Sequence, residues 1–281
     1  MISIIFCGFG RLGQKTLINL VDNGFDIKYV LTHKELLEDS VDTYCKKMNI
    51  RYSYKDSRKN KEETKRKFSD FKPNFLISVN YRFIIPKEIY GLAKHPINIH
   101  GSLLPKYRGR SPHVWSIING ETFSGVTCHL MEEKVDTGDI VHQVTVPINK
   151  QDTGATLLAK FEVIYPNVAL MSIKRLLSGE ELIKQNDLEA TYYGKRIPEM
   201  GYIDFFKEAD EVINFVRAQS YPYPGAYSYL INGTKIIIDS IEVCEQNLLE
   251  LPIGVVRRIN GNYYVHCKNS LLLITKYRFD E

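Results

Sequence analysis

An asparagine and a histidine, Asn98 and His100, stand two residues apart in an apolar stretch. Ile97 and Ile99 alternate with them, which is the period of a β-strand, so the amide and the imidazole project from the same face. An imidazole can accept a proton near neutral pH, and an amide NH₂ group can donate to a developing oxyanion. The pair therefore suits attack on a carbonyl group, although polar residues at a strand end also commonly satisfy backbone groups.

The residues that follow the pair are irregular and cationic. Gly101 ends the alternation, and Lys106, Arg108 and Arg110 come within the next ten positions. We predict a strand that ends in a basic loop. The segment Val135-Asp136-Thr137-Gly138-Asp139 begins 35 residues after His100 and supplies a carboxylate. An aspartate in Asp-Thr-Gly can also be a simple turn residue.

Strands and helices alternate before the pair. The apolar patterns predict strands at Ser3–Cys7, Asp26–Leu31 and Phe75–Val79, with helices from about Gln14 to Asn23 and from Glu35 to Met48. Such alternation is typical of a Rossmann-like parallel sheet with helices on both faces, an α/β fold whose functional groups gather at the carboxyl ends of the strands. Both His100 and the segment around Tyr81 are expected at such ends.

The later part of the chain divides into two segments with different sequence patterns. A helix at His113–Asn119, a strand at Val126–Met131 and a long helix at Leu157–Ser178 complete a catalytic domain over residues 1–190. Residues 191–281 then predict a helix near Lys207–Gln219 and short strands with turn signals at Asn232-Gly233 and Asn260-Gly261. We therefore expect a small β-rich C-terminal domain.

Composition limits the class of protein. The formal charge is +4, and five scattered cysteines without a CxxC pair favour reduced thiols and a cytoplasmic location. The N-terminus lacks a basic leader, and we expect no apolar run that approaches a membrane span. The interleaved charges of Lys55–Lys67 indicate a solvated surface rather than a nucleic-acid site.

Two further motifs have alternative interpretations. Gly8-Phe9-Gly10-Arg11-Leu12-Gly13 fits the GxGxxG pattern of dinucleotide sites, but the next strand ends at Thr32-His33 without the acidic residue that would bind a ribose hydroxyl. A tight strand-to-helix turn also explains it. Cys128, His129 and His142 match no zinc spacing, and alternation sends Cys128 and His129 to opposite faces, so we expect no metal site.

The composite motif is more specific than any of its parts. The stretch PINIHGSLLPKYRGRSP from Pro96 to Pro112, followed by Val135–Asp139, resembles the folate-dependent formyltransferases. The resemblance is strong over about residues 75 to 145, and the stretch SPHVWSIING is similar to the branch that formylates amino sugars carried on a nucleotide.

This resemblance implies roles for individual residues. Asn98 would stabilise the oxyanion, His100 would move the proton of the attacking amine, and Asp136 would hold the imidazole. The formyl donor would be N10-formyltetrahydrofolate, used as a co-substrate. Matching the motifs one by one gives a set of folate contacts, namely Arg82, Phe83, Ile84, Arg110, Glu132, Glu133, Lys134, Val135 and Asp136.

The implied acceptor is the amine of a dTDP-linked amino-dideoxy sugar, with dTDP-4-amino-4,6-dideoxyglucose foremost, in O-antigen or surface-glycan synthesis. Lys106, Tyr107 and Arg108 would meet its pyrophosphate, and Tyr223 would stack on the base or only pack its domain. Family habit suggests a homodimer. A methionyl-tRNA formyltransferase is the alternative, but residues 191–281 hold 10 basic and 11 acidic side chains, a net charge of −1, which disfavours RNA. A nucleotide-binding oxidoreductase is a third interpretation, based on GxGxxG alone.

Overall fold

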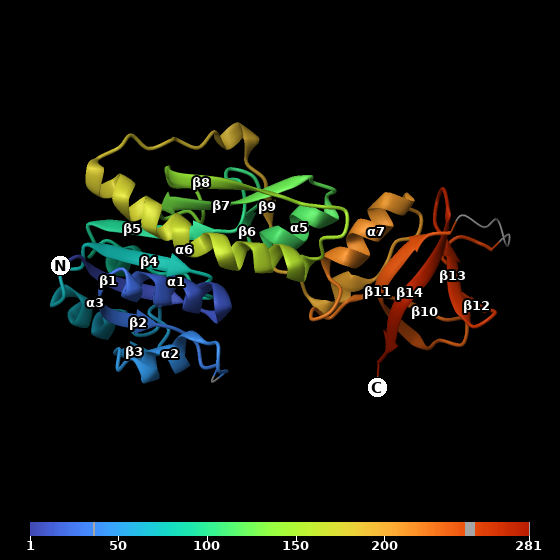
Figure 1. Ribbon diagram of the computed structural model, residues 1–281, viewed down its shortest axis with the longest axis horizontal. Helices are drawn as coiled ribbons and strands as arrows, with labels where there is room; N and C mark the ends of the chain where they lie inside the picture. Colours follow the sequence, from blue (N-terminus) through green and yellow to red (C-terminus); the bar gives the residue numbers. More distant parts are fainter. Residues whose placement is uncertain (36, 245–250, 281) are drawn as a thin grey trace. The chain divides into compact units, whose positions relative to one another are not determined.

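The computed structural model describes residues 1–35, 37–244 and 251–280 (Figure 1). The chain divides into two compact units, which we describe separately. The first holds residues 1–109, 125–146 and 160–192, and the second holds residues 110–124, 147–159 and 193–281. This grouping differs from a single boundary near residue 190, because two short segments that precede residue 160 group with the C-terminal residues.

The larger sheet has seven strands in the order β3-β2-β1-β4-β5-β7-β8. Neighbouring strands from β3 to β5 are parallel, whereas β7 runs antiparallel to β5. The predicted Rossmann-like sheet is confirmed, with antiparallel pairing added beyond β5. The strands are β1 (Ser3–Gly8), β2 (Asp26–Leu31), β3 (Tyr52–Ser53), β4 (Phe75–Val79), β5 (His95–His100), β7 (Phe123–Leu130) and β8 (Ile140–Pro147).

Helices cover both faces of this sheet. Strand alternation sends Ile5 to one face, where it shares a buried cluster with Phe68 and Ile89 of two short helices. On the other face, Lys15 joins the first helix to the longest one through a 2.7 Å hydrogen bond to Glu162. The helices are α1 (Gly10–Asp22), α2 (Val41–Lys47), α3 (Lys61–Ser69), α4 (Lys87–Tyr90) and α6 (Gly154–Ser178).

The long helix α6 corrects one sequence expectation. Among the described residues, it alone is long and apolar enough to cross a membrane by length and composition, with 44% of its most apolar window buried inside the structure. Its buried side chains pack on the sheet: a Cβ added at Gly101 would lie 3.0 Å from both Phe161 and Tyr165. These contacts are those of a core helix.

The GxGxxG segment forms the turn between β1 and α1. Gly10 adopts a φ of +64°, in the left-handed region that favours glycine. A Cβ at Gly13 would lie 3.1 Å from the carbonyl carbon of Gly8, so the helix can approach the strand closely only with glycine there. Local packing therefore accounts for these glycines without a dinucleotide.

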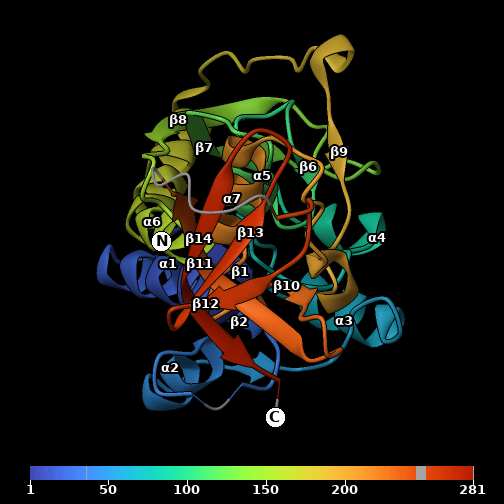
Figure 2. The same cartoon turned by 90° about the vertical axis from the view of Figure 1, so that its right-hand side faces the viewer.

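The second unit contains a five-stranded antiparallel sheet in the order β10-β11-β14-β13-β12 (Figure 2). Helix α7 (Ala209–Ala218) packs Val212 and Val216 against it, and α5 (Pro112–Ile118) packs on α7. The predicted β-rich C-terminal domain is confirmed. Its strands are β10 (Ala226–Tyr229), β11 (Lys235–Val243), β12 (Arg257–Ile259), β13 (Asn262–His266) and β14 (Leu271–Phe279), and a short 3₁₀ helix η2 (Pro198–Gly201) precedes α7.

The two predicted turn signals both connect strands of this sheet. Asn260 and Gly261 have φ angles of 48° and 88°, and the strands pair directly across them at Ile259 and Asn262. Positive φ at both central residues is the requirement of the tight hairpin turn that Asn-Gly favours. Asn232-Gly233 likewise lies between β10 and β11.

Candidate active site

Strand β5 presents Asn98 and His100 at its carboxyl end, as the alternation predicts. The antiparallel partner β7 places His129 directly opposite Asn98. Asp136, in the loop between β7 and β8, completes the group. His100, His129 and Asp136 are buried, whereas Asn98 is half-buried. The structure thus brings together the three residues predicted to be catalytic and adds a second histidine.

Hydrogen-bond donors surround the Asp136 carboxylate. Oδ2 accepts from the Gly109 backbone N–H at 2.9 Å and lies 3.5 Å from His100 Nδ1. Oδ1 lies 3.4 Å from His129 Nε2 and 3.5 Å from Asn98 Nδ2. Burial alone would raise the pKa of Asp136, but the two histidines and the Gly109 N–H outweigh it and hold the pKa well below its ordinary value. The carboxylate is therefore a fixed negative charge.

Both ring nitrogens of His100 face oxygen atoms. Nε2 lies 2.8 Å from the carbonyl oxygen of Tyr107, which can only accept, so Nε2 carries a hydrogen. Nδ1 lies 3.5 Å from Asp136 Oδ2. To take a proton through Nε2, the imidazole must exchange the Tyr107 oxygen for the substrate.

His129 is the site residue that the sequence analysis missed. Its Nδ1 donates to the Leu130 carbonyl oxygen at 2.7 Å, and its Nε2 lies 3.1 Å from Asn98 Nδ2. Alternation did predict that His129 and Cys128 face opposite ways, but the pairing of β7 with β5 was needed to place His129 at Asn98. Cys128 is buried elsewhere, and burial raises the pKa of its thiol to about 12. Within the described ranges, no group of three His, Cys, Asp or Glu side chains could hold a metal ion.

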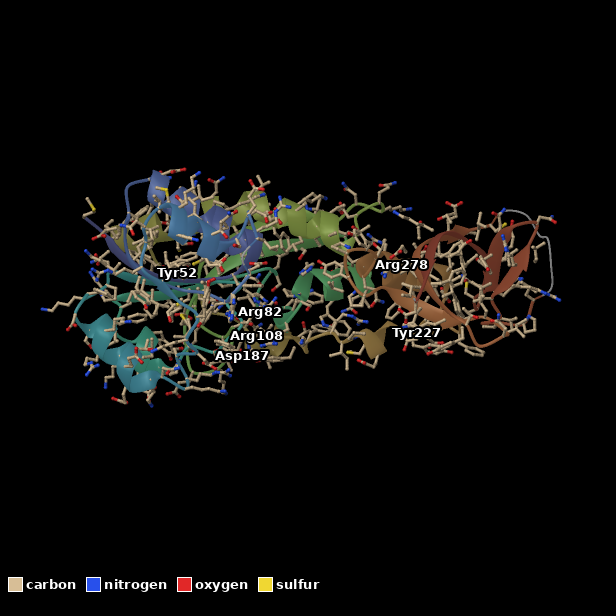
Figure 3. The ribbon with its side chains drawn as sticks, turned by 90° about the horizontal axis from the view of Figure 1, so that it is seen from below. Tyr52, Arg82, Arg108, Asp187, Tyr227 and Arg278 are labelled. Carbon is tan, nitrogen blue, oxygen red and sulfur yellow. The ribbon has the colours of Figure 1, made fainter. Side chains whose placement is uncertain are left out.

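Arg108 differs from its predicted role as a pyrophosphate ligand. Its side chain is fully buried, and its guanidinium donates to Gln185 Oε1, to Asp187 Oδ1 at 2.8 Å and to the Tyr192 hydroxyl. Arg108 and Asp187 are labelled in Figure 3. The cation is thus engaged within the chain. Lys106 is exposed and Tyr107 is buried with a φ of 61°. The substrate roles of all three stay predictions.

The two parts of the chain match two family descriptions. Residues 4–171 match the formyl transferase family, and residues 196–281 match the formyl transferase C-terminal domain. The chain belongs to the formyl transferase family. It is a formyltransferase, and the resemblance inferred from the Pro96–Pro112 motif is confirmed.

Relatives of this formyltransferase carry different names. A methionyl-tRNA formyltransferase of Caldanaerobacter subterraneus subsp. tengcongensis is 31% identical, covering 96% of this chain and 90% of the relative. The bifunctional polymyxin resistance protein ArnA of Wigglesworthia glossinidia brevipalpis is 33% identical over 99% of this chain, which spans only 43% of that longer protein. The fold is shared with the N-formyltransferase of Helicobacter canadensis, solved with folinic acid and dTDP-3-aminofucose, at a TM-score of 0.77 and 21% identity, covering 99% of this chain and all of that one.

Apart from Arg110, the predicted folate residues of the formyltransferase lie on two segments of the first unit. Arg82 places its guanidinium 3.8 Å from the centre of the Phe9 ring, and its backbone N–H donates to His33 Nε2 at 3.1 Å. The ring of Phe83 packs edge-on against His33, and Ile84 is exposed. Glu132, Glu133, Lys134 and Val135 are exposed on the loop that leads to Asp136. An exposed apolar side chain beside aromatic rings suits a flat ligand. The assignment of these residues to folate binding stays a prediction.

Two predicted ligands belong to the second unit. The Arg110 backbone N–H donates to the Tyr193 carbonyl oxygen at 2.9 Å. The Tyr223 hydroxyl lies 2.9 Å from His113 Nε2, and burial lowers the pKa of His113 to about 4. The imidazole is therefore neutral at pH 7 and shares one hydrogen bond with the phenol. This contact uses the Tyr223 hydroxyl within its own unit, and stacking on a base stays a prediction.

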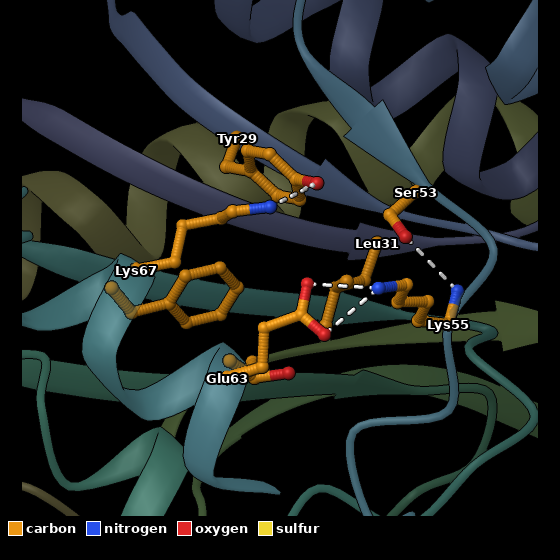
Figure 4. Close-up of a pocket in the computed structure, with 8 residues that line it drawn as sticks. Tyr29, Leu31, Ser53, Lys55, Glu63 and Lys67 are labelled. Carbon is orange, nitrogen blue, oxygen red and sulfur yellow. Dashed lines mark hydrogen bonds and ion pairs between the residues drawn. The ribbon is translucent and has the colours of Figure 1, made fainter. Parts of the chain in front are cut away.

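A small pocket beside β2 and α3 includes none of the candidate catalytic residues (Figure 4). Lys55 forms a 2.8 Å ion pair with Glu63 there, and Lys67 donates to the Tyr29 hydroxyl at 3.2 Å. Some charged side chains of the segment Lys55–Lys67 thus pair with each other, which agrees with the predicted solvated surface. The β5 end remains the candidate active site.

Proposed function

We propose that this formyltransferase moves the formyl group of N10-formyltetrahydrofolate to the amine of a dTDP-linked amino-dideoxy sugar, with dTDP-4-amino-4,6-dideoxyglucose as the foremost acceptor. The observation that carries the chemistry is the cluster of Asn98, His100 and Asp136 at the end of β5. The donor and acceptor are supported by the Helicobacter canadensis enzyme, which was solved with folinic acid and a dTDP-amino sugar.

The proposed reaction is an acyl transfer between two nitrogen atoms. The acceptor amine attacks the formyl carbon, a carbon–nitrogen bond forms, and the bond from the formyl carbon to N10 of the folate breaks. Asn98 donates to the oxyanion from its Nδ2, whose contact with Asp136 is a long 3.5 Å. His100 takes a proton from the amine and returns it to N10, while Asp136 balances the charge of the imidazolium. Atoms and protons balance without a metal ion.

A tRNA acceptor is the second candidate, because the Caldanaerobacter relative carries that name at 31% identity. Phosphate-backbone binding depends on clustered cations. Residues 191–281 hold 10 basic and 11 acidic side chains, so the C-terminal domain has no excess of cations for RNA. This count, together with the SPHVWSIING stretch, favours a small nucleotide-linked acceptor.

The deciding experiment follows the mass of each acceptor. The protein is incubated with N10-formyltetrahydrofolate and either dTDP-4-amino-4,6-dideoxyglucose or charged initiator tRNA, with His100→Asn as the matched inactive control. We expect a formyl gain on the sugar nucleotide only. A formyl gain on the tRNA, with none on dTDP-, UDP- or GDP-amino sugars, would overturn the acceptor and leave the catalytic residues standing. Light scattering tests the associated proposal of a homodimer.

A further inference from the structure

The segment that follows α6 runs along the catalytic loop of the first unit. Ile183 and Ile140 exchange two backbone hydrogen bonds, of 2.8 and 3.0 Å. A short 3₁₀ helix η1 (Asp187–Glu189) follows, and then β9 (Tyr192–Tyr193) pairs with β6 (Arg108–Gly109). The segment is therefore anchored at both ends, and Gln185 lies between the anchors.

The NH₂ group and the carbonyl oxygen of the Gln185 side chain each form two hydrogen bonds. Nε2 donates to the backbone carbonyl oxygens of Asp136 at 3.0 Å and of Gly138 at 2.7 Å. Oε1 accepts from Arg108 Nε at 3.2 Å and from its terminal nitrogen at 2.8 Å. One amide thus connects the backbone of the Asp136 loop to a fully buried arginine.

Arg108 sits between two residues that contact the catalytic group through their backbones. The preceding Tyr107 offers its carbonyl oxygen to His100 Nε2, and the following Gly109 donates its N–H to Asp136 Oδ2. Asp136 itself has a φ of 60°, a conformation that a non-glycine residue keeps only where its surroundings hold it. A shift of either end of the Gln185 bridge would therefore move His100 and Asp136 relative to each other.

We propose that Gln185 is a positioning residue for formyl transfer: its amide ties the Asp136 loop to Arg108 and so fixes the carboxylate against His100. The inference rests on the proposed function in one respect, the participation of Asp136 in the reaction. In this proposal Gln185 acts through Asp136, whose backbone carbonyl oxygen it contacts.

Gln185→Glu tests the bridge because it keeps the shape and the acceptors for Arg108 but removes both N–H donors. We expect kcat to fall about 10- to 100-fold, since displacing catalytic groups by about 1 Å costs that order of rate. The KM values for folate and acceptor should stay within about threefold, because we do not expect the substitution to remove an interaction that binds substrate and transition state equally. Asp187→Ala is the matched control: it removes an exposed partner of Arg108 without touching Asp136, and its kcat should stay within about threefold.

A double-mutant cycle separates positioning from a general structural role. In an Asp136→Asn background, Gln185→Glu should lower kcat by less than about threefold, because the group that it positions has already been altered. An undiminished loss in that background, or normal turnover of Gln185→Glu, would overturn the inference. Normal turnover of Asp136→Asn alone would instead overturn the proposed chemistry. If Gln185→Glu does not fold, Gln185→Met is held to the same criteria, and loss of folded protein in both variants would reject positioning in favour of a purely structural role.

Discussion

Replacing Asp136 by asparagine removes a charge at the centre of the site while keeping the side chain's shape. An aspartate that orients a catalytic imidazole contributes about 10⁴ in rate in hydrolytic triads, and general acid–base groups contribute about 10²–10⁴. We expect Asp136→Asn to lower kcat by a factor in this range, equivalent to about 3–5 kcal/mol at about 1.4 kcal/mol per tenfold change. The rate is followed by the mass of the formylated acceptor.

Asp136→Asn should lower the free energy of unfolding by less than it raises the activation free energy of formyl transfer. If the new amide turns its NH₂ toward Gly109, a half-buried backbone N–H loses its acceptor at a cost of at most about 1–3 kcal/mol. If it turns the other way, the oxygen keeps Gly109, and the NH₂ faces Asn98 Nδ2 and His129 Nε2. Urea unfolding at pH 7 should therefore show a loss of at most about 1–3 kcal/mol.

The same variant has a signature in the pH dependence of stability. Because the folded-state pKa of Asp136 lies below its ordinary value, the ionised carboxylate contributes stability that is fully present above the ordinary pKa of about 3.9. That contribution is lost as the pH falls through the folded-state pKa. Below about pH 4, the wild-type unfolding free energy should fall more steeply than that of Asp136→Asn. Equal slopes, or turnover within about threefold of wild type, would refute the reasoning.

Three further substitutions test the same site. His100→Asn should remain folded and lose about 10²–10⁴ in kcat, and near-normal turnover of the folded protein would remove its role in proton transfer. Asn98→Ala should lose about 10²–10³ in kcat with a smaller change in KM, whereas a change in KM alone would show that Asn98 holds substrate. Gly138→Ala should lower the free energy of unfolding by about 1–3 kcal/mol in urea, because the new Cβ would lie 2.0 Å from the Leu130 carbonyl oxygen, and wild-type stability would show that this loop relaxes.

Local patterns predicted the parts of this site that lie on regular elements. Alternation placed Asn98 and His100 on one face of a strand, and the buried runs gave β2 and β4 with the bounds that the structure shows. Helix ends were less accurate: among the described residues of the segment predicted from Glu35 to Met48, the helix runs from Val41 to Lys47. Charge alternation cannot specify which residues of a polar segment are helical, since tertiary packing decides it.

Contacts between distant segments could not be predicted from one sequence. His129 joined the site only through the pairing of β7 with β5, which no local signal specifies. Gln185 reaches Asp136 across 49 positions from an irregular segment. Arg108 was predicted to contact a pyrophosphate, and its local sequence gave no sign of its three partners Gln185, Asp187 and Tyr192, which explain its burial.

The way the second unit is assembled has a practical consequence for dividing this chain. Helix α5 and the first residues of α6 belong with α7 and the C-terminal sheet, although α7 begins 91 positions after the end of α5 and 50 positions after residue 159. Arg217 of α7 donates to the carbonyl oxygens of Asn149 and Asp152, which lie just before α6. A fragment cut at residue 191 would leave these partners behind and expose the α5-binding side of α7. Chimeras that exchange the second unit between relatives should therefore transfer residues 110–124 and 147–159 together with residues 193–281, so that the transplanted unit keeps its own helices.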